Sequence, residues 1–203
     1  LSVQFRRDAL YPTFVKDFYT ELDKAGMKFF SSYWGYEEDS LEETIEWNQR
    51  KLEADFNLGF TEHCSHDYKQ VVYKLSGYSE VRGFWMNNYP EDGEFTYEII
   101  IPESDVLAKG YPVSFKEERI EELLGFSKRV WQFPPVRAIQ TGLEIEDDST
   151  SLAELAQGGC PNAWPFAIVE ELGACHEDSV YDIQPISKGK KGVLFWRTGT
   201  DNE

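Results

Sequence analysis

Apolar residues recur along this chain with two periods, one helical and one extended. From Pro12 to Gly26 they fall on one face of a helix, with Pro12 in its first turn and Gly26 as its C-terminal cap. Residues 29–34, of which Phe29, Phe30, Tyr33 and Trp34 are aromatic, favour a half-buried strand, and Gly35 allows a break after it. A helical stripe then predicts a second helix, interrupted at Asn48, whose buried side is formed by Leu41, Ile45, Leu52 and Phe56.

Two capping boxes mark the starts of predicted helices. Ser40 with Glu43, and Ser114 with Glu117, each place a hydroxyl and a carboxylate three residues apart. In that arrangement each side chain can bind a backbone N–H group that the first helical turn leaves unpaired. The second box predicts a helix that ends before Pro134.

Short runs of aromatic and β-branched residues between turn residues predict the strands. They cover residues 2–5, 71–75, 81–86, 95–101, 136–145, 164–169, 180–186 and 193–197. The turns among residues 71–101 favour an antiparallel meander, and residues 152–157 predict one or two helical turns. Because no repeat or long linker interrupts the pattern, we predict a single α+β domain over residues 1–203, a mainly antiparallel sheet flanked by about three helices.

Composition and charge narrow the classes of partner. The 203 residues are 41% hydrophobic and 15% aromatic, which is typical of a globular domain rather than a disordered acidic tail. The formal net charge of −17 argues against direct nucleic-acid binding, which depends on basic side chains that neutralise phosphates. A basic protein is the natural counterpart, although solubility alone is a common reason for an acidic composition.

Cysteine usage and apolar-run length predict the compartment. Cys64, Cys160 and Cys175 are an odd number without the spacing of a disulfide framework, so we expect reduced thiols. The N-terminal residues lack a secretory apolar core, and no run approaches the roughly 20 apolar residues of a membrane span. The expectation is a soluble cytoplasmic protein that does not associate with membranes.

Residue types used in metal and hydrolase sites gather in one segment and one distant pair. His63, Cys64 and His66 lie within four residues, and Cys175 with His176 joins them if the two segments meet. The spacing is not that of a structural zinc site, and a catalytic triad needs side chains that converge from separate elements. We therefore predict no metal, cofactor or catalytic residue, and keep a small hydrolase or metal-dependent enzyme built on these residues as the alternative.

The acidic start of the second predicted helix is the stronger candidate for a functional surface. Trp47 lies about 160° to 200° around the helix from Ile45, so it is either exposed or covered by another segment. Tryptophan and tyrosine are frequent binding hot spots, and carboxylates accelerate association with a basic partner. The predicted partner-binding residues are Tyr36, Glu37, Glu38, Glu42, Glu43, Glu46 and Trp47, with Glu146, Asp147 and Asp148 from a later acidic turn.

Scattered aromatic residues and glycines carry a resemblance over residues 27–197. They are Tyr33-Trp34-Gly35 before a polar helix, Trp131 with Pro134 ahead of a strand, Trp164 in a late strand, and the terminal Gly192-Val193-Leu194. In this order the chain resembles small bacterial immunity proteins of polymorphic toxin and type VI secretion systems. Such relatives tend to carry a basic residue after the Trp-Gly pair, where this chain has Tyr36, Glu37 and Glu38.

The resemblance implies a non-enzymatic protein that binds and blocks a cognate toxin. This is the leading hypothesis from the sequence, with a basic effector as partner. The enzyme built on the histidine and cysteine residues remains the alternative. A third hypothesis is an acidic mimic of nucleic acid, which requires carboxylates at phosphate-like spacing.

Overall fold

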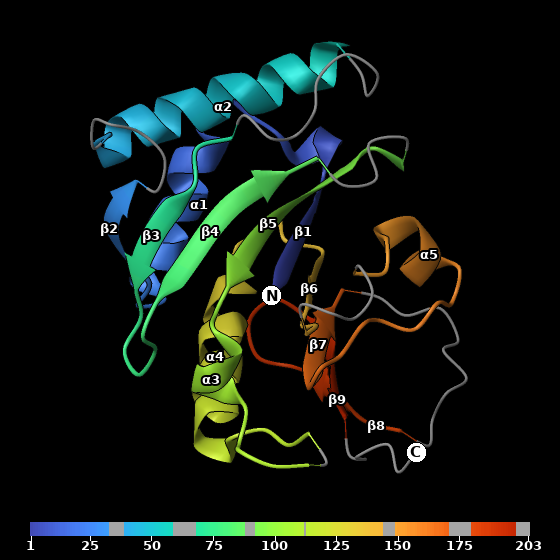
Figure 1. Cartoon of the computed structure of the whole chain (residues 1–203). Coiled ribbons are helices and arrows are strands. Elements are labelled where there is room, and N and C mark those ends of the chain that lie inside the picture. The colour runs from blue at the N-terminus through green and yellow to red at the C-terminus, as the bar shows by residue number, and fades with distance from the viewer. Residues whose placement is uncertain are drawn as a thin grey trace. The chain divides into compact units, whose positions relative to one another are not determined.

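The computed structural model describes the chain except for residues 33–38, 59–67, 88–91, 112, 144–148, 171–179 and 198–203, and the side chains of residues 55–58. The chain divides into two compact units (Figure 1). Gln4–Ile101 form the N-terminal unit, and Leu1–Val3 with Pro102–Glu203 form the C-terminal unit. The described residues contain nine strands and five α-helices, which confirms the α+β class with a mainly antiparallel sheet. The single domain stays a prediction.

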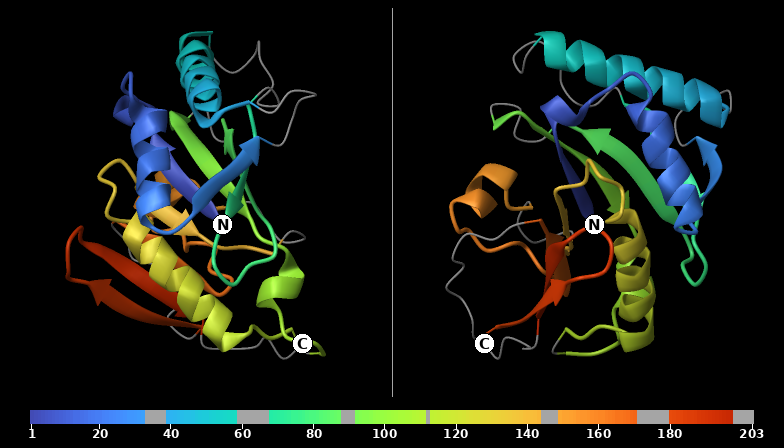
Figure 2. Two further views of the ribbon diagram at one scale, coloured as in Figure 1. Left: turned by 90° about the vertical axis from the view of Figure 1, so that its left-hand side faces the viewer. Right: turned by 180° about the vertical axis from the view of Figure 1, so that it is seen from behind.

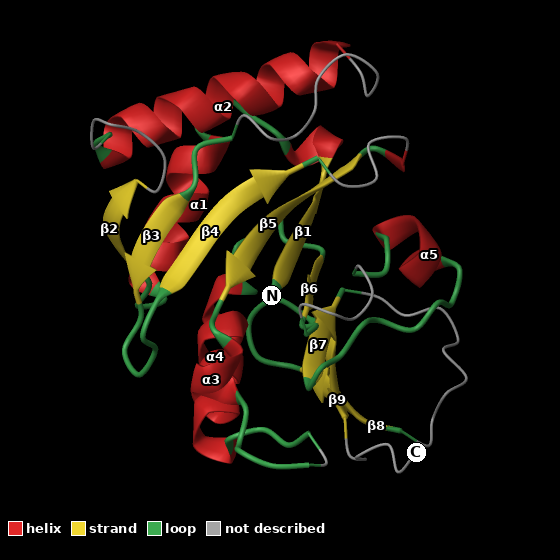
Figure 3. Cartoon of the chain, viewed as in Figure 1, coloured by secondary structure: helices red, strands yellow, loops and turns green. Residues whose placement is uncertain are grey.

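The N-terminal unit contains most of the predicted elements of the first half of the chain (Figures 1 and 3). Its strands follow the order β2-β3-β4-β5-β1, and the pairings β2–β3, β3–β4 and β4–β5 are antiparallel, as the meander prediction requires. The elements are β1 (Ser2–Arg6), which begins in the other unit, η1 (Arg7–Ala9), α1 (Phe14–Lys24), β2 (Lys28–Ser32), α2 (Leu41–Leu58), β3 (Val71–Lys74), β4 (Val81–Met86) and β5 (Glu94–Ile100).

Aromatic side chains fill the core of this unit between α1 and the strands. Figure 2 shows α1 lying across one face of the strands, and its buried stripe supplies Phe14 and Phe18. Both rings pack edge-on against Phe5 of β1, at 5.2 Å between centroids. Trp85 of β4 is fully buried and its ring lies 4.7 Å from that of Tyr97 on β5. The helix is therefore held to the strands mainly by aromatic contacts, each worth ~1 kcal/mol beyond the burial of its area.

The C-terminal unit contains a second set of antiparallel strands. Its strands follow the order β6-β7-β9-β8, with antiparallel pairings β6–β7, β7–β9 and β8–β9. The elements are α3 (Glu103–Val106), α4 (Glu117–Val130), β6 (Ala138–Gln140), α5 (Leu152–Ala156), β7 (Phe166–Val169), β8 (Tyr181–Ile186) and β9 (Gly192–Arg197). A small apolar cluster packs between α5 and the strands and includes Leu152, Leu155 and Phe195.

Three predictions about the C-terminal unit are wrong or incomplete. Ser114 does not cap α4, because Lys116 occupies the N-cap position and makes no side-chain cap bond. Of the predicted strand over residues 136–145, residues 144 and 145 lie outside the described residues, and the described part is reduced to Ala138–Gln140. The Val136 N–H donates to the Phe133 carbonyl in a turn at 3.1 Å, which delays the start of the strand. The short helix α3 was not predicted, because four residues are too few to show a helical period.

Candidate partner-binding surface on helix α2

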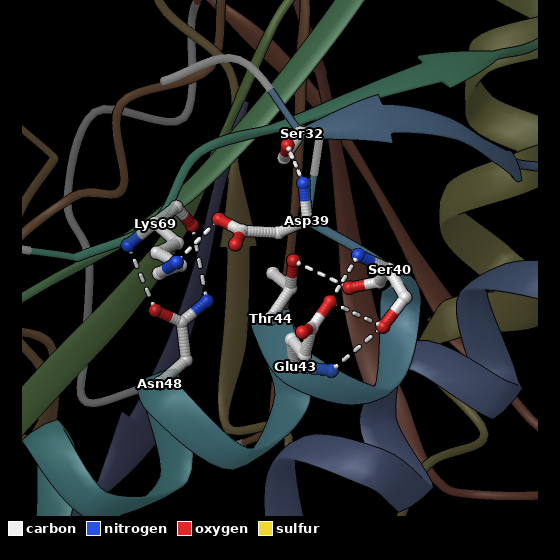
Figure 4. Close-up of polar contacts among 7 residues, drawn as sticks. All are labelled: Ser32, Asp39, Ser40, Glu43, Thr44, Asn48 and Lys69. Atoms are coloured by element: carbon white, nitrogen blue, oxygen red, sulfur yellow. Dashed lines mark hydrogen bonds and ion pairs between the residues drawn. The ribbon is translucent and has the colours of Figure 1, made fainter. Parts of the chain in front are cut away.

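The first turn of α2 is fixed by the predicted capping box (Figure 4). The Glu43 carboxylate accepts hydrogen bonds from the Ser40 N–H and hydroxyl, both at 2.8 Å, and the Glu43 N–H donates to the Ser40 hydroxyl at 3.2 Å. The bonds from Ser40, aided by the charge of Lys69, lower the pKa of Glu43. This carboxylate is therefore ionised at neutral pH, and the box prediction at Ser40 is confirmed.

The buried side of α2 is polar, contrary to the predicted stripe. Thr44, Asn48 and Gln49 are buried with Leu52, whereas Leu41 and Ile45 are only partly buried. The side chain of Phe56 lies outside the described residues. The predicted stripe therefore identified the buried side at Leu52 and at Asn48, which interrupts it, but it did not show that hydrogen bonds attach much of this face of the helix.

Asn48 makes three of these hydrogen bonds, and Figure 4 shows the two that it forms with Lys69. Its amide nitrogen donates to the Tyr19 hydroxyl and to the Lys69 carbonyl, both at 3.0 Å, and its oxygen accepts from the Lys69 N–H at 2.9 Å. The Tyr19 hydroxyl also accepts from the Trp85 indole at 3.1 Å. Burial raises the pKa of Tyr19 to about 12, so this phenol stays neutral at ordinary pH.

Gln49 attaches α2 to the start of α1. Its amide oxygen accepts from the Val15 N–H at 3.0 Å, and its nitrogen donates to the Tyr11 carbonyl at 2.9 Å. Thr13, the N-cap of α1, makes no side-chain cap bond. A side chain of α2 therefore satisfies an N–H group in the first turn of α1, where a local cap would otherwise act.

The outer side of α2 carries an exposed tryptophan among carboxylates. Trp47 is 41% exposed, and Glu42, Glu43 and Glu46 are exposed on the same N-terminal half of the helix. Two cations lie over the indole ring, with the Lys69 ammonium 5.2 Å and the Arg50 guanidinium carbon 6.0 Å from its centroid. Of the two alternatives for Trp47, the structure shows the exposed one.

Lys69 connects this surface to the end of β2 (Figure 4). Its ammonium forms an ion pair with Asp39, and the Asp39 N–H donates to the Ser32 hydroxyl at 3.0 Å. The Arg50 guanidinium donates to the Glu46 carbonyl at 3.3 Å. Both cations near Trp47 thus have partners of their own, and the carboxylates of Glu42 and Glu46 remain on the outer side of the helix.

The structure brings together only part of the predicted surface. Glu42, Glu43, Glu46 and Trp47 share the first turns of α2. Tyr36, Glu37 and Glu38, and the turn of Glu146, Asp147 and Asp148, lie outside the described residues. So do His63, Cys64, His66, Cys175 and His176, on which the enzyme alternative depends. Within the described part of the chain, no group of three or more metal-binding side chains is found.

A second polar cluster, which sequence reasoning missed, lies in the C-terminal unit. The Lys190 ammonium donates to the Pro134 carbonyl at 3.1 Å and to the Val136 carbonyl, and it lies 4.2 Å from the centroid of the Trp131 ring. Burial lowers the pKa of Lys190 to about 8, while the charge of Glu170, 3.9 Å away, acts in the opposite direction. The lysine ties the turn before β9 to the segment between α4 and β6, so we interpret it as structural.

The expectation of three reduced thiols is wrong, because Cys160 is disulfide-bonded. The two other cysteines lie outside the described residues. Odd cysteine number and irregular spacing did not reveal the bond, since the spacing of cysteines in sequence does not report which of them meet in the fold.

Comparisons with known proteins supply no relative. No family model matches the chain, and neither the curated proteins nor the solved structures contain a match. Among the described residues, no helix has the length and apolar character required to cross a membrane. The evidence about function therefore comes from the chain itself.

Proposed function

We propose that this chain is a binding protein that recognises a basic protein partner through the outer face of α2, and that it acts as an immunity protein against a toxin. The observation that carries the proposal is Trp47, 41% exposed on a helix whose first turns present Glu42, Glu43 and Glu46. A large aromatic residue at the centre of a charged rim is the common anatomy of a hot spot. The toxin partner rests on the resemblance described for the sequence.

Charge supports the choice of a basic partner. The net charge of −17 gives the protein a negative field, and the carboxylates at the start of α2 add to it locally. Such fields raise the association rate with a basic partner by about tenfold to a thousandfold at low salt. Of the two cations over Trp47, Lys69 is paired with Asp39, whereas Arg50 donates to a backbone carbonyl and keeps its charge. The three carboxylates at the start of α2 outnumber this one cation, so the surface stays acidic.

The disulfide bond of Cys160 indicates the cellular compartment in which the protein works. Disulfides form and persist in oxidising compartments and are rare in the reducing cytoplasm. Because Cys160 is disulfide-bonded, we propose that the protein works in an oxidising compartment, in place of the cytoplasm expected from the sequence. Mass spectrometry of the protein isolated from its own cells, alkylated before reduction, tests this. Free alkylated Cys160 would contradict it.

Charge reversal tests the binding surface. The partner for the measurement is the product of the gene adjacent to this one in its genome. The variant E42K/E46K, which leaves the capping carboxylate of Glu43 in place, is compared with E80K/D182K, which changes two exposed acids outside α2 and brings the net charge to the same value. We expect the first variant to associate at least tenfold more slowly at low salt than the second. Equal association rates and equal salt dependence would refute the assignment of the surface, and a failure of the wild type to bind and neutralise that product would refute the toxin partner.

A further inference from the structure

The segment between α3 and α4 is a hairpin-like loop held by backbone hydrogen bonds. Leu107 and Phe115 form an antiparallel bridge, the Ala108 N–H donates to the Ser114 carbonyl at 2.8 Å, and the Lys116 N–H donates to the Val106 carbonyl at 2.7 Å. Figure 1 shows the described arms of this loop extending sideways from the start of α4, while residue 112 lies outside the described residues. Ser114, predicted as a helix cap, instead closes this loop.

The loop presents the most exposed large hydrophobic residue in the described part of the chain. Tyr111 is 86% exposed and Val113 is 42% exposed. Gly110 precedes Tyr111 with φ of 125°, in the region that favours glycine, so the backbone turns sharply at the tip. A tyrosine side chain has only two rotatable torsions, so it loses little conformational freedom when it binds, which is a property of a good anchor.

Acidic residues surround the base of this loop. Residues 103–122 contain six acids and three bases. Two of the bases are engaged locally, since the Lys116 ammonium donates to the Ser104 carbonyl at 2.7 Å and Arg119 pairs with Glu122 at 2.8 Å. The acids are Glu103, Asp105, Glu117, Glu118, Glu121 and Glu122. The third base, Lys109, is exposed beside the tip, but residues 103–122 as a whole carry three more acids than bases. This net negative charge complements a basic surface and disfavours an anionic membrane or a nucleic acid.

We propose that the loop of residues 107–115 is an anchor that inserts Tyr111 into an apolar pocket on a basic protein partner. The proposal rests on the proposed function and deepens it, because it assigns to the C-terminal unit a contact of its own. Tyr111 supplies the buried ring, Val113 adds apolar contact beside it, and the acids of α3 and α4 meet basic residues at the rim of the pocket. This contact could not be predicted from the sequence, since one tyrosine in a loop has no period and no motif.

A peptide selection tests the proposal without knowledge of the partner. The probe is a phage-displayed library of random linear twelve-residue peptides, selected on the wild-type protein. We expect the enriched peptides to combine lysine or arginine with a large apolar residue. The affinity of the strongest synthetic peptide is then measured for Tyr111→Ala and for Phe30→Ala. Phe30 is a suitable control because it is an exposed aromatic residue, at 56%, with its ring 4.0 Å from the Lys74 ammonium rather than near a group of acids.

We expect Tyr111→Ala to weaken the peptide at least tenfold and Phe30→Ala to change it less than twofold. No enrichment, enrichment of acidic peptides, or equal effects of the two variants would overturn the anchor. So would Tyr111-dependent binding to phosphatidylglycerol vesicles, which would assign the loop to a lipid surface, or Tyr111-dependent dimerisation in sedimentation.

The variant E42K/E46K separates this proposal from the proposed function when binding of the product of the adjacent gene is measured. Binding of that product that is lost in E42K/E46K but kept in Tyr111→Ala supports the α2 surface and refutes the anchor. The reverse pattern supports the anchor and refutes the α2 surface. Tyr111 is exposed, so its replacement by alanine leaves the fold intact, and circular dichroism of the variant checks this.

Discussion

Asn48→Ala removes the hydrogen bonds that attach the middle of α2 to the rest of the N-terminal unit. Asn48 is fully buried and makes three bonds, one to the Tyr19 hydroxyl and two to the backbone of Lys69. At about 1 kcal/mol each, their loss costs about 3 kcal/mol. Alanine is the better helix former by about 0.6 kcal/mol, so we expect a net loss of about 2.5 kcal/mol in the free energy of unfolding.

Urea unfolding followed by circular dichroism measures this loss of unfolding free energy, which we expect as a lower midpoint urea concentration at an unchanged m-value. Hydrogen exchange of the α2 amides locates it, since these amides should lose protection before those of β4. The control is Arg50→Ala on the exposed side of the same helix, expected within about 0.5 kcal/mol of wild type. A loss below about 1 kcal/mol, or one equal to that of the control, would refute the reasoning.

Asn48→Asp tests the same bonds with the shape of the side chain preserved. An ionised carboxylate can still accept from the Lys69 N–H, but it cannot donate to the Lys69 carbonyl. Burial would raise the folded-state pKa of the new carboxyl above its unfolded value. The variant should therefore be destabilised at pH 7 and approach wild-type stability as the pH falls below about 4, the pKa of the unfolded side chain. Destabilisation that does not change with pH would contradict the reasoning.

Further substitutions and one titration test other parts of the fold. Gly83→Ala should lose about 1–3 kcal/mol, because the new Cβ would lie 2.8 Å from ring carbons of Tyr97. Gly125→Ala, inside α4, should gain up to about 1 kcal/mol, because its Cβ would meet only the end of the Arg129 side chain, at an ordinary contact distance of 3.7 Å. Urea unfolding compares the free energies of the two variants. Ser40→Ala should lose about 1 kcal/mol and Ser114→Ala less than about 0.5 kcal/mol, and equal losses would contradict the observed caps. The raised pKa of Tyr19, about 12, contributes stability that is complete below pH 10 and falls by about 1.4 kcal/mol per pH unit between 10 and 12. Tyr19→Phe should reduce that slope in alkaline unfolding curves.

The sequence predicted correctly those features that depend on interactions between residues close together in the chain. The cap at Ser40 depends on residues within one turn, so its spacing was sufficient. The same spacing at Ser114 failed because a backbone bond to Ala108 places that serine in a loop. The polar side of α2 was missed for a related reason, since the partner of Asn48 on α1, Tyr19, is 29 residues away and apolar periodicity does not register buried amides.

The candidate surface was predictable to the same extent. The helical period left Trp47 either exposed or covered by another segment, and the structure shows it exposed, with Glu46 exposed beside it. Lys69, whose ammonium lies 5.2 Å from the Trp47 ring, comes from beyond the end of α2, and no spacing rule connects the two. The loop that carries Tyr111 could not be predicted for the same reason, since its backbone hydrogen bonds join Val106 to Lys116 and Ala108 to Ser114, and no spacing rule connects these residues.

The buried amides of α2 determine the rotational phase of the helix about its own axis. Successive residues differ by about 100°, so a shift of one position would take Asn48 and Gln49 away from their partners on α1 and at Lys69. An apolar stripe tolerates such a rotation more easily, because apolar contacts have little directional preference. Replacement of these amides with leucine could therefore preserve a stable helix but rotate it about its axis, so that the Trp47 side chain would point in a different direction.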